Sequence, residues 1–152
     1  MNTKFIITRN AGILAATALG AFAVSGSMAS PADKPSDADN FYKSGRISQQ
    51  EVKFNNQYRM KVAGNLFLPK DMDKEARCPA IIVGHPMGAV KEQSANLYAA
   101  KMAERGFVTL ALDLPFWGGS DGEPRNSVSP DMYAEAFSAA ADYLGTRPFV
   151  DR

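Results

Sequence analysis

The chain contains one histidine and one cysteine among its 152 residues. The common zinc sites use three or four His and Cys ligands, so this composition excludes them, and a lone cysteine cannot form a disulfide within the chain. The chain also has almost no excess of charge of either sign. The 17 basic and 16 acidic residues leave a formal net charge of +1, which argues against binding nucleic acid through a basic face. We therefore expect no metal, no cofactor and no nucleic-acid partner.

The sequence also lacks an apolar run long enough for a membrane-spanning helix. The run at 11–24 has about 14 residues, whereas a span needs roughly 20. It follows two basic residues, Lys4 and Arg9, and precedes small residues that lead to Ala29. This is the three-part plan of a secretory signal peptide. We expect residues 1–29 to be removed from a periplasmic or secreted product, with a buried N-terminal helix as the alternative.

Residues 30–43 are predicted to form a flexible linker, because their prolines, serines and aspartates leave little apolar surface to bury. The folded domain is then 44–152. The 152 residues fit one ordinary domain and leave little over for a second.

Hydrophobic periodicity predicts the order strand, strand, strand, helix, strand, helix. Alternating residues predict strands at 52–55 and 60–68, and continuous apolar runs at 80–83 and 107–112 predict strands covered on both faces. An antiparallel hairpin should therefore lead into a right-handed β-α-β crossover. The expected buried helix stripes are Ala95, Tyr98, Ala99 and Met102, then Tyr133, Phe137, Ala140 and Leu144, with Gly106 and Gly145 as C-caps and Ser129 as the second N-cap.

The loops after the two parallel strands carry the most distinctive motifs. His85-Pro86-Met87-Gly88 follows one strand, and Gly118-Gly119-Ser120-Asp121-Gly122 follows the other. With the opening hairpin, the Lys91-Glu92-Gln93 helix entry and the Gly106-Phe107-Val108 step, they resemble the N-terminal half of the α/β-hydrolase superfamily. The most similar members are bacterial dienelactone-hydrolase-like and acyl-peptidase-like enzymes. The resemblance covers 44–152 and implies an α/β fold, with the hairpin leading into a mostly parallel sheet flanked by helices.

The resemblance implies that the backbone N–H of Met87 is an oxyanion-hole donor. Pro86 has no N–H and cannot take this role. A donor that is already oriented stabilises the negative charge of a tetrahedral intermediate. His85 is expected to tie its loop down through side-chain hydrogen bonds, and Phe116 and Trp117 are expected to line the substrate pocket with it.

Three further residues invite a catalytic interpretation that the sequence context disfavours. Ser120 matches the G-x-S-x-G nucleophile pattern, but no strand leads directly into it and no helix starts directly after it. Asp113 ends a strand, yet not the strand after which the family places its acid, so we expect it to be a hydrogen-bonded loop anchor. Cys78 is expected to be a small buried apolar residue.

The resemblance places the nucleophile, the acid and the catalytic histidine after Arg152, so we expect a truncated copy that is inactive alone. The implied activity is that of a secreted hydrolase of ester, thioester or amide bonds, acting on a small-molecule acyl substrate by nucleophilic acyl transfer. A non-catalytic secreted α/β binding module and a peptidase of the same fold remain the alternatives.

Exported material should begin near Ser30, because the basic, apolar and small-residue segments of 1–29 follow the order of a cleaved signal. Intact-mass measurement of protein from the periplasm or the medium tests this expectation. Exported protein that still carries Met1 would show that 1–29 is not a cleaved signal peptide.

Overall fold

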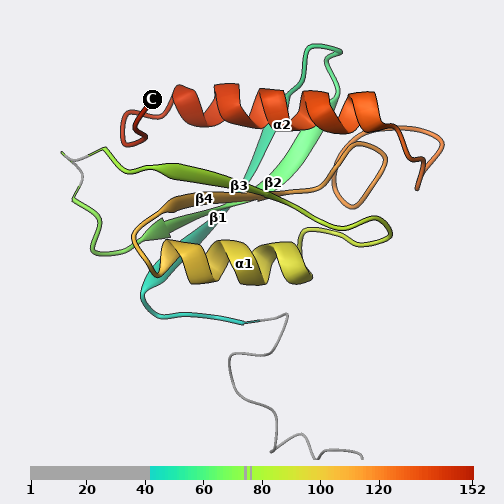
Figure 1. Cartoon of the computed structure of the whole chain (residues 1–152). Coiled ribbons are helices and arrows are strands. Elements are labelled where there is room, and N and C mark those ends of the chain that lie inside the picture. Colours follow the sequence, from blue (N-terminus) through green and yellow to red (C-terminus); the bar gives the residue numbers. More distant parts are fainter. Residues whose placement is uncertain (1–41, 74, 76) are drawn as a thin grey trace, which may run out of the picture.

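The structure is a computed structural model that describes residues 42–73, 75 and 77–152 (Figure 1). The expected signal peptide, and the linker up to residue 41, lie outside the described residues. The elements are β1 (Ile47–Asn55), β2 (Lys61–Pro69), β3 (Ala80–Gly84), α1 (Ser94–Ala103), β4 (Val108–Leu112) and α2 (Pro130–Gly145). This order confirms the prediction. Neither helix in the described part of the chain has the length and apolarity needed to cross a membrane.

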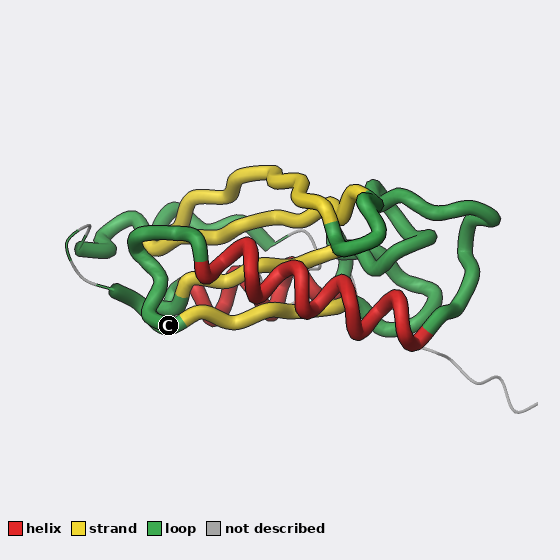
Figure 2. The backbone as a smooth tube through the Cα atoms, turned by 90° about the horizontal axis from the view of Figure 1, so that it is seen from above, coloured by secondary structure: helices red, strands yellow, loops and turns green. Residues whose placement is uncertain are grey.

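The four strands form one sheet in the order β1-β2-β4-β3. β2 pairs antiparallel with both β1 and β4, whereas β3 and β4 are parallel. The parallel pair requires a crossover, and α1 provides it. Helices α1 and α2 lie on opposite faces of the sheet (Figures 1 and 2). The predicted hairpin and β-α-β crossover are both present.

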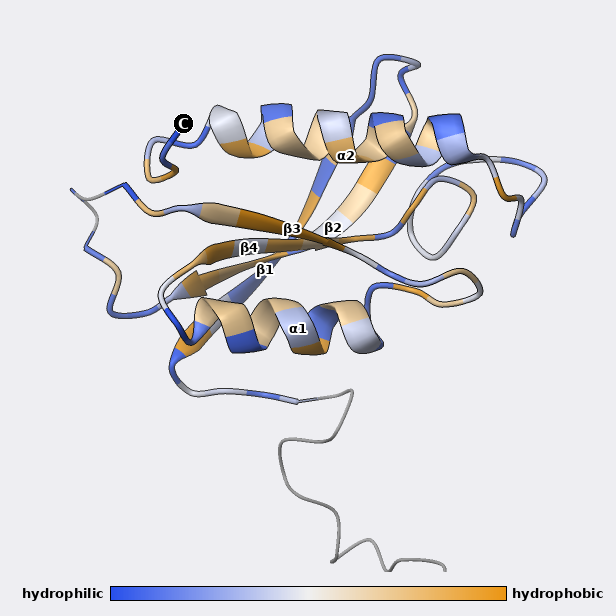
Figure 3. Ribbon diagram, in the orientation of Figure 1, coloured by the Kyte–Doolittle hydropathy of each residue, from blue (hydrophilic) through white to orange (hydrophobic). Residues whose placement is uncertain are grey.

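Two apolar clusters, one on each face, hold the helices against the sheet (Figure 3). The larger lies under α2 and includes Val62, Leu110 and Leu112, none of which is exposed. The smaller lies under α1 and consists mostly of alanines of that helix. Every residue of β4 is buried, which confirms the prediction of a strand covered on both faces. The same prediction for the strand at 80–83 is met only in part, because all five residues of β3 are half-buried at the edge of the described sheet.

The helix stripes differ from the prediction in their large residues. Tyr98 is 64% exposed and Phe137 is 38% exposed. The buried positions of α1 are Ala95, Ala99, Ala100 and Ala103, and those of α2 are Ala136, Ala139, Ala140 and Leu144. Small side chains let each helix axis approach the sheet closely, so an aromatic ring is left at the edge of the contact.

Strand and helix ends differ as well. β1 begins at Ile47 rather than at residue 52, because its early residues pair fully with β2 while their side chains stay exposed and show no apolar alternation. Ser129 holds the N-cap position as predicted, although its side chain makes no capping hydrogen bond. Neither predicted C-cap glycine is the C-cap, because Glu104 caps α1 and Thr146 caps α2, both in the right-handed conformation. Gly106 does have the expected positive φ, at 95°, but two residues after Glu104.

The N-terminal end of the described chain is fastened to α1. The hydroxyl of Tyr42 donates a 2.6 Å hydrogen bond to Glu104, and the ammonium of Lys101 lies 3.8 Å from the centre of the Tyr42 ring. Hydrogen bonds from Ser44 and Tyr42 hold the pKa of Glu104 below its ordinary value. Tyr42, the second-last residue of the predicted linker, is therefore packed against the end of α1.

β3 is at one edge of the described sheet, and on its outer side a partner is present only for the chain just before the strand. Cys78 forms a parallel bridge with Val150. Two hydrogen bonds hold the bridge, from Cys78 N–H to Phe149 O at 3.0 Å and from Asp151 N–H to Cys78 O at 2.9 Å. Beside it, a pocket of about 340 Å³ is lined by Ile82 and other apolar residues, together with Asp151 and Arg152. The strand edge that continues from the bridge is apolar and carries no charged residue, a combination that promotes pairing between chains.

Purified residues 30–152 should therefore self-associate. Size-exclusion chromatography across a concentration series should show oligomers that grow with concentration, because an apolar strand edge with free N–H and C=O groups pairs with other chains. Binding of a dye specific for exposed apolar surface gives an independent reading. A monodisperse monomer at every concentration would contradict this expectation.

Candidate functional site

The two loops with the distinctive motifs lie at the same end of the sheet. The β3 loop (85–93) leads from β3 to α1, and the β4 loop (113–129) leads from β4 to α2. Gly84 is paired with Leu112 at the ends of the parallel strands, so both loops leave the sheet side by side. In open α/β sheets, ligands bind outside the carboxyl ends of the strands. This edge is therefore the candidate site.

His85 uses both ring nitrogens to hold the two loops together. The backbone N–H of Leu114 donates to its Nε2 at 3.1 Å, so Nδ1 carries the proton and donates to the carbonyl of Pro86 at 2.9 Å. The side chain is buried, and its ring makes an edge-type contact with the ring of Trp117, with the ring centres 6.1 Å apart. The hydrogen bonds expected for His85 are present, and they leave no ring nitrogen for a general base.

The turn after His85 presents Met87 at the surface. Met87 is 75% exposed, and the turn is closed by a 3.1 Å hydrogen bond from Ala89 N–H to Pro86 O. Among the described residues, no hydrogen bond involves the backbone N–H of Met87. Gly88 follows with a φ of 82°, a conformation that glycine adopts without strain. The turn thus leaves the N–H of Met87, and that of Gly88, available to a ligand.

A buried ion pair joins the end of the β3 loop to the start of the β4 loop. The carboxylate of Asp113 has no exposure to solvent, and Lys91 Nζ lies 2.7 Å from its Oδ2. The ammonium of Lys91 also contacts the carboxylate of Glu92. Burial by itself lowers the pKa of Lys91, but the hydrogen bonds to Asp113 and Glu92 outweigh burial and raise that pKa above its ordinary value. The ammonium of Lys91 therefore stays charged at neutral pH.

The hydroxyl of Ser120 points into the fold. It donates to the carbonyl of Asp113 at 2.7 Å and accepts from the backbone N–H of Ala63 at 2.9 Å. Ser120 is 3% exposed and lies ten residues before α2 begins at Pro130. The segment from Gly118 to Gly122 therefore has neither the strand–turn–helix context nor the exposed hydroxyl of a nucleophile elbow.

Phe116 and Trp117 both shape the β4 loop. Phe116 has a φ of 73°, and its ring lies where a Cβ on Gly122 would be. The indole N–H of Trp117 donates to Tyr133 Oη at 2.7 Å and to Ser127 O at 3.1 Å, which ties the loop to the start of α2. Both rings are half-buried. Their predicted contact with substrate stays a prediction.

The sequence did not point to Arg125, a residue of the β4 loop that makes hydrogen bonds to the backbone of the same loop. Its guanidinium donates to three backbone carbonyls, those of Gly118, Ser120 and Gly122, at 2.7 to 3.2 Å. The Lys91–Asp113 pair was missed as well. A signal for the pair existed, because opposite charges follow the ends of two neighbouring parallel strands.

Cys78 is half-buried in its bridge with Val150, away from both loops along β3. The described residues contain no group of three His, Cys, Asp or Glu side chains that could hold a metal ion.

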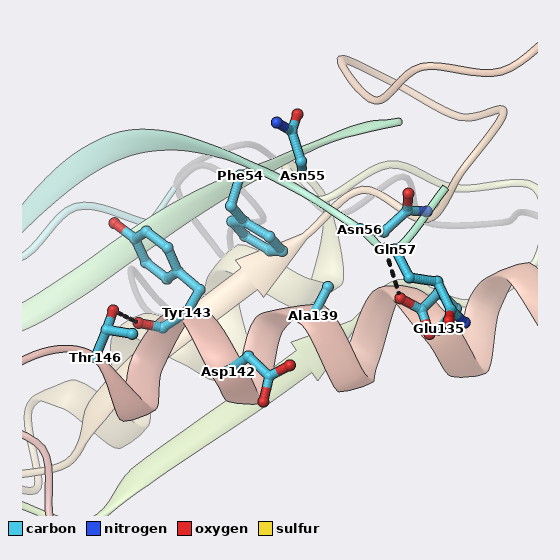
Figure 4. Close-up of a pocket in the computed structure, with 9 residues that line it drawn as sticks. All are labelled: Phe54, Asn55, Asn56, Gln57, Glu135, Ala139, Asp142, Tyr143 and Thr146. Carbon is cyan, nitrogen blue, oxygen red and sulfur yellow. Dashed lines mark hydrogen bonds between the residues drawn. The ribbon is translucent and has the colours of Figure 1, made fainter. Parts of the chain in front are cut away.

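A separate groove of about 440 Å³ lies between the β1–β2 turn and α2 (Figure 4). The carboxylate of Glu135 closes one end by accepting hydrogen bonds from the backbone and side-chain amide of Gln57, at 2.9 and 2.7 Å. Phe54 stacks on Tyr143 with ring centres 4.9 Å apart. No residue of the β3 loop or the β4 loop lines this groove, so the chemistry expected of those loops belongs elsewhere.

No family model matches the chain. An uncharacterized protein of Pseudomonas aeruginosa, PA2218, is 50% identical over 109 residues, which are 72% of this chain and 29% of that protein. Thiohydrolase aneE of Aspergillus aculeatus is 32% identical over 101 residues, which are 66% of this chain and 30% of that protein. The chain thus spans about three tenths of the length of these curated relatives.

Solved structures agree with the sequence comparisons. The crystal structure of PA2218 has a TM-score of 0.71 at 47% identity, over 78% of this chain and 37% of the solved one. The α/β-hydrolase GrgF from Penicillium sp. sh18 has a TM-score of 0.62 at 27% identity, over 68% of this chain and 34% of the solved one.

The role of Ser120 can be tested in a hybrid protein in which residues 44–152 replace the matching region of the Pseudomonas relative. Ser120→Ala leaves the N–H of Ala63 and the carbonyl of Asp113 without their partner, so we expect a stability loss of about 1–3 kcal/mol in thermal or denaturant unfolding. Ester hydrolysis should stay within about tenfold of the unsubstituted hybrid, whereas loss of a nucleophile costs several orders of magnitude. A loss of that size in folded protein would identify Ser120 as the nucleophile.

Proposed function

We propose that this chain, which has part of the α/β-hydrolase fold, contributes the oxyanion-hole loop of a secreted hydrolase. The enzyme would cleave ester, thioester or amide bonds of small acyl compounds by nucleophilic acyl transfer. The likeness to hydrolases and to a thiohydrolase supports this at the level of the reaction class. The placement in the dienelactone-hydrolase-like or acyl-peptidase-like group, as an N-terminal half, rests on the sequence motifs.

The observation that carries the proposal is the free backbone N–H of Met87. It lies in the loop after β3, from which α/β-hydrolases take one of their oxyanion donors. The flanks of its turn are fixed by the hydrogen bonds of His85 and Lys91. A donor that does not have to reorganise during the reaction stabilises developing charge most effectively.

In the proposed reaction, a nucleophile attacks the acyl carbon and the carbonyl oxygen gains a negative charge. The N–H of Met87 donates to that oxygen, and a second donor comes from the residue after the nucleophile. Neither Ser120 nor His85 takes the nucleophile or base role, because their polar atoms are engaged inside the fold. The proposal therefore assigns the nucleophile, acid and base to residues outside this sequence.

The name of the Aspergillus aculeatus relative favours thioesters as a first substrate class to test. The alternatives are a peptidase of the same fold and a non-catalytic binding module. Assays of the hybrid protein with thioester, p-nitrophenyl ester and peptide substrates distinguish the proposed hydrolase from the peptidase. A binding module would hydrolyse none of these substrates.

Met87→Pro in the hybrid protein removes the proposed donor, since proline has no backbone N–H. We expect kcat to fall about 10²–10³-fold, the usual effect of deleting one oxyanion donor. Met87→Ala is the matched control: it removes the same side chain, keeps the N–H, and should leave kcat within a few-fold.

Thermal unfolding of the unsubstituted hybrid and both variants shows whether each is folded. Equal rates for the proline and alanine variants, at equal stability, would contradict the oxyanion role. The 152-residue chain alone should hydrolyse none of the substrates. Turnover by that chain, lost on His85→Ala, would instead indicate a self-contained enzyme.

A further inference from the structure

Asp113 receives hydrogen bonds from both loops of the candidate site. Its Oδ1 accepts from the backbone N–H of Lys91 at 2.8 Å, and its Oδ2 accepts from Lys91 Nζ at 2.7 Å. The same Oδ2 accepts from the backbone N–H of Gly119 at 2.8 Å. One carboxylate, entirely buried, thus links the end of the β3 loop to the middle of the β4 loop.

The β4 loop is shaped to let its backbone reach this carboxylate. Gly118 has a φ of 50°, and a Cβ there would overlap the carboxylate of Asp113. A Cβ on Gly119 would meet the Cβ of Ala63 at 3.2 Å and lie 3.8 Å from Lys91 Nζ. Gly118 and Gly119 therefore permit the close approach of the loop to a buried ion pair.

The β3 loop is held at two points with Met87 between them. His85 fixes its start through Leu114 and Pro86, and Asp113 fixes its end through the backbone and side chain of Lys91. The turn that carries the free N–H consequently has little freedom to rotate. Without the hydrogen bonds between Asp113 and Lys91, only those of His85 would hold the turn that carries the Met87 N–H.

A stabilising role alone accounts poorly for this pair. A buried ion pair often gives no more stability than apolar side chains of the same volume, because removing two charges from water offsets their attraction. Its hydrogen bonds are directional, however, and fix two backbone segments relative to each other. A geometric role is the better match to the observed contacts.

We infer that Lys91 and Asp113 are positioning residues that orient the Met87 N–H through the β3 loop. The inference rests on the proposed function. It assigns no contact with substrate to either residue. Misplacing a catalytic group by about 1 Å costs on the order of 10²-fold in rate, so the pair should affect kcat much more than KM.

The test compares three variants of the hybrid protein with the unsubstituted hybrid. Asp113→Asn keeps the size of the side chain but removes its charge and one acceptor, and Lys91→Met keeps the stem but removes the ammonium. Each should lower kcat roughly 10²-fold, with KM within about threefold. Lys91→Arg keeps the positive charge, and its kcat should be within about tenfold of that of the unsubstituted hybrid.

Ser120→Ala is the control for a purely structural loss. It removes two buried hydrogen bonds of the same β4 loop that do not involve the carboxylate. Hydrogen exchange should accelerate at least about tenfold at the hydrogen-bonded amides of Ala89 and Lys91 in the Asp113 and Lys91 variants. The same amides should exchange unchanged in Ser120→Ala. Assays are run well below each variant's unfolding temperature.

The outcomes separate the two claims. If Met87→Pro lowers kcat and Asp113→Asn and Lys91→Met do so no more than Ser120→Ala, the positioning inference is wrong and the oxyanion role stands. If Met87→Pro has no effect in folded protein, the proposed function fails, and the inference fails with it. Should Asp113→Asn not fold, Lys91→Met with rescue by Lys91→Arg decides the question.

Discussion

A carboxylate sealed from water, that of Asp113, is the point around which the carboxyl edge of the sheet is arranged. Such a charge is costly to bury unless it is paired and fully hydrogen-bonded. The ammonium of Lys91 and the N–H groups of Lys91 and Gly119 meet that need. Both loops must then follow paths that bring these donors together, and this requirement places Met87 in a short turn with fixed ends.

The sheet gives that carboxylate a rigid base. Asp113 follows directly after β4, an interior strand of the sheet, whose five residues are all buried. Its backbone N–H continues the pairing with β2 by donating to Ala63 O at 2.9 Å. On the α1 side, Thr109 Oγ1 donates to Ala99 O at 2.8 Å, which fixes the helix that follows the β3 loop. Packing of the core and geometry of the site are thus parts of one arrangement.

The sequence predicted the order of elements and the two loops, because continuous apolar runs and glycine-rich turns are local signals. It predicted the buried faces of the helices less well. Tyr98 and Phe137 are aromatic and were expected to be buried, but they lie at the edges of contacts that alanines make. Helix-to-sheet distance is a property of the assembled fold and leaves no local trace.

The candidate site shows the same division. The turn at Met87 and the misleading match around Ser120 could be interpreted from neighbours in sequence. Opposite charges after two neighbouring strands were a signal for the pairing of Lys91 with Asp113, but they do not specify its hydrogen bonds. The hydrogen bonds from Arg125 to three nearby carbonyls depend on the path of the β4 loop, which the sequence did not predict. Asp113 was expected to be a loop anchor, but the partners it anchors could not be named in advance.

The central claim is that the backbone N–H of Met87 donates a hydrogen bond to the oxyanion. Its most direct test is the crystal structure of the hybrid protein after reaction with a phosphonate ester, which leaves a tetrahedral adduct on the nucleophile. The account predicts an adduct oxygen about 2.7–3.1 Å from Met87 N, with His85 and Asp113 still holding both ends of the turn. An adduct whose oxygens all lie more than about 3.5 Å from that nitrogen would contradict it.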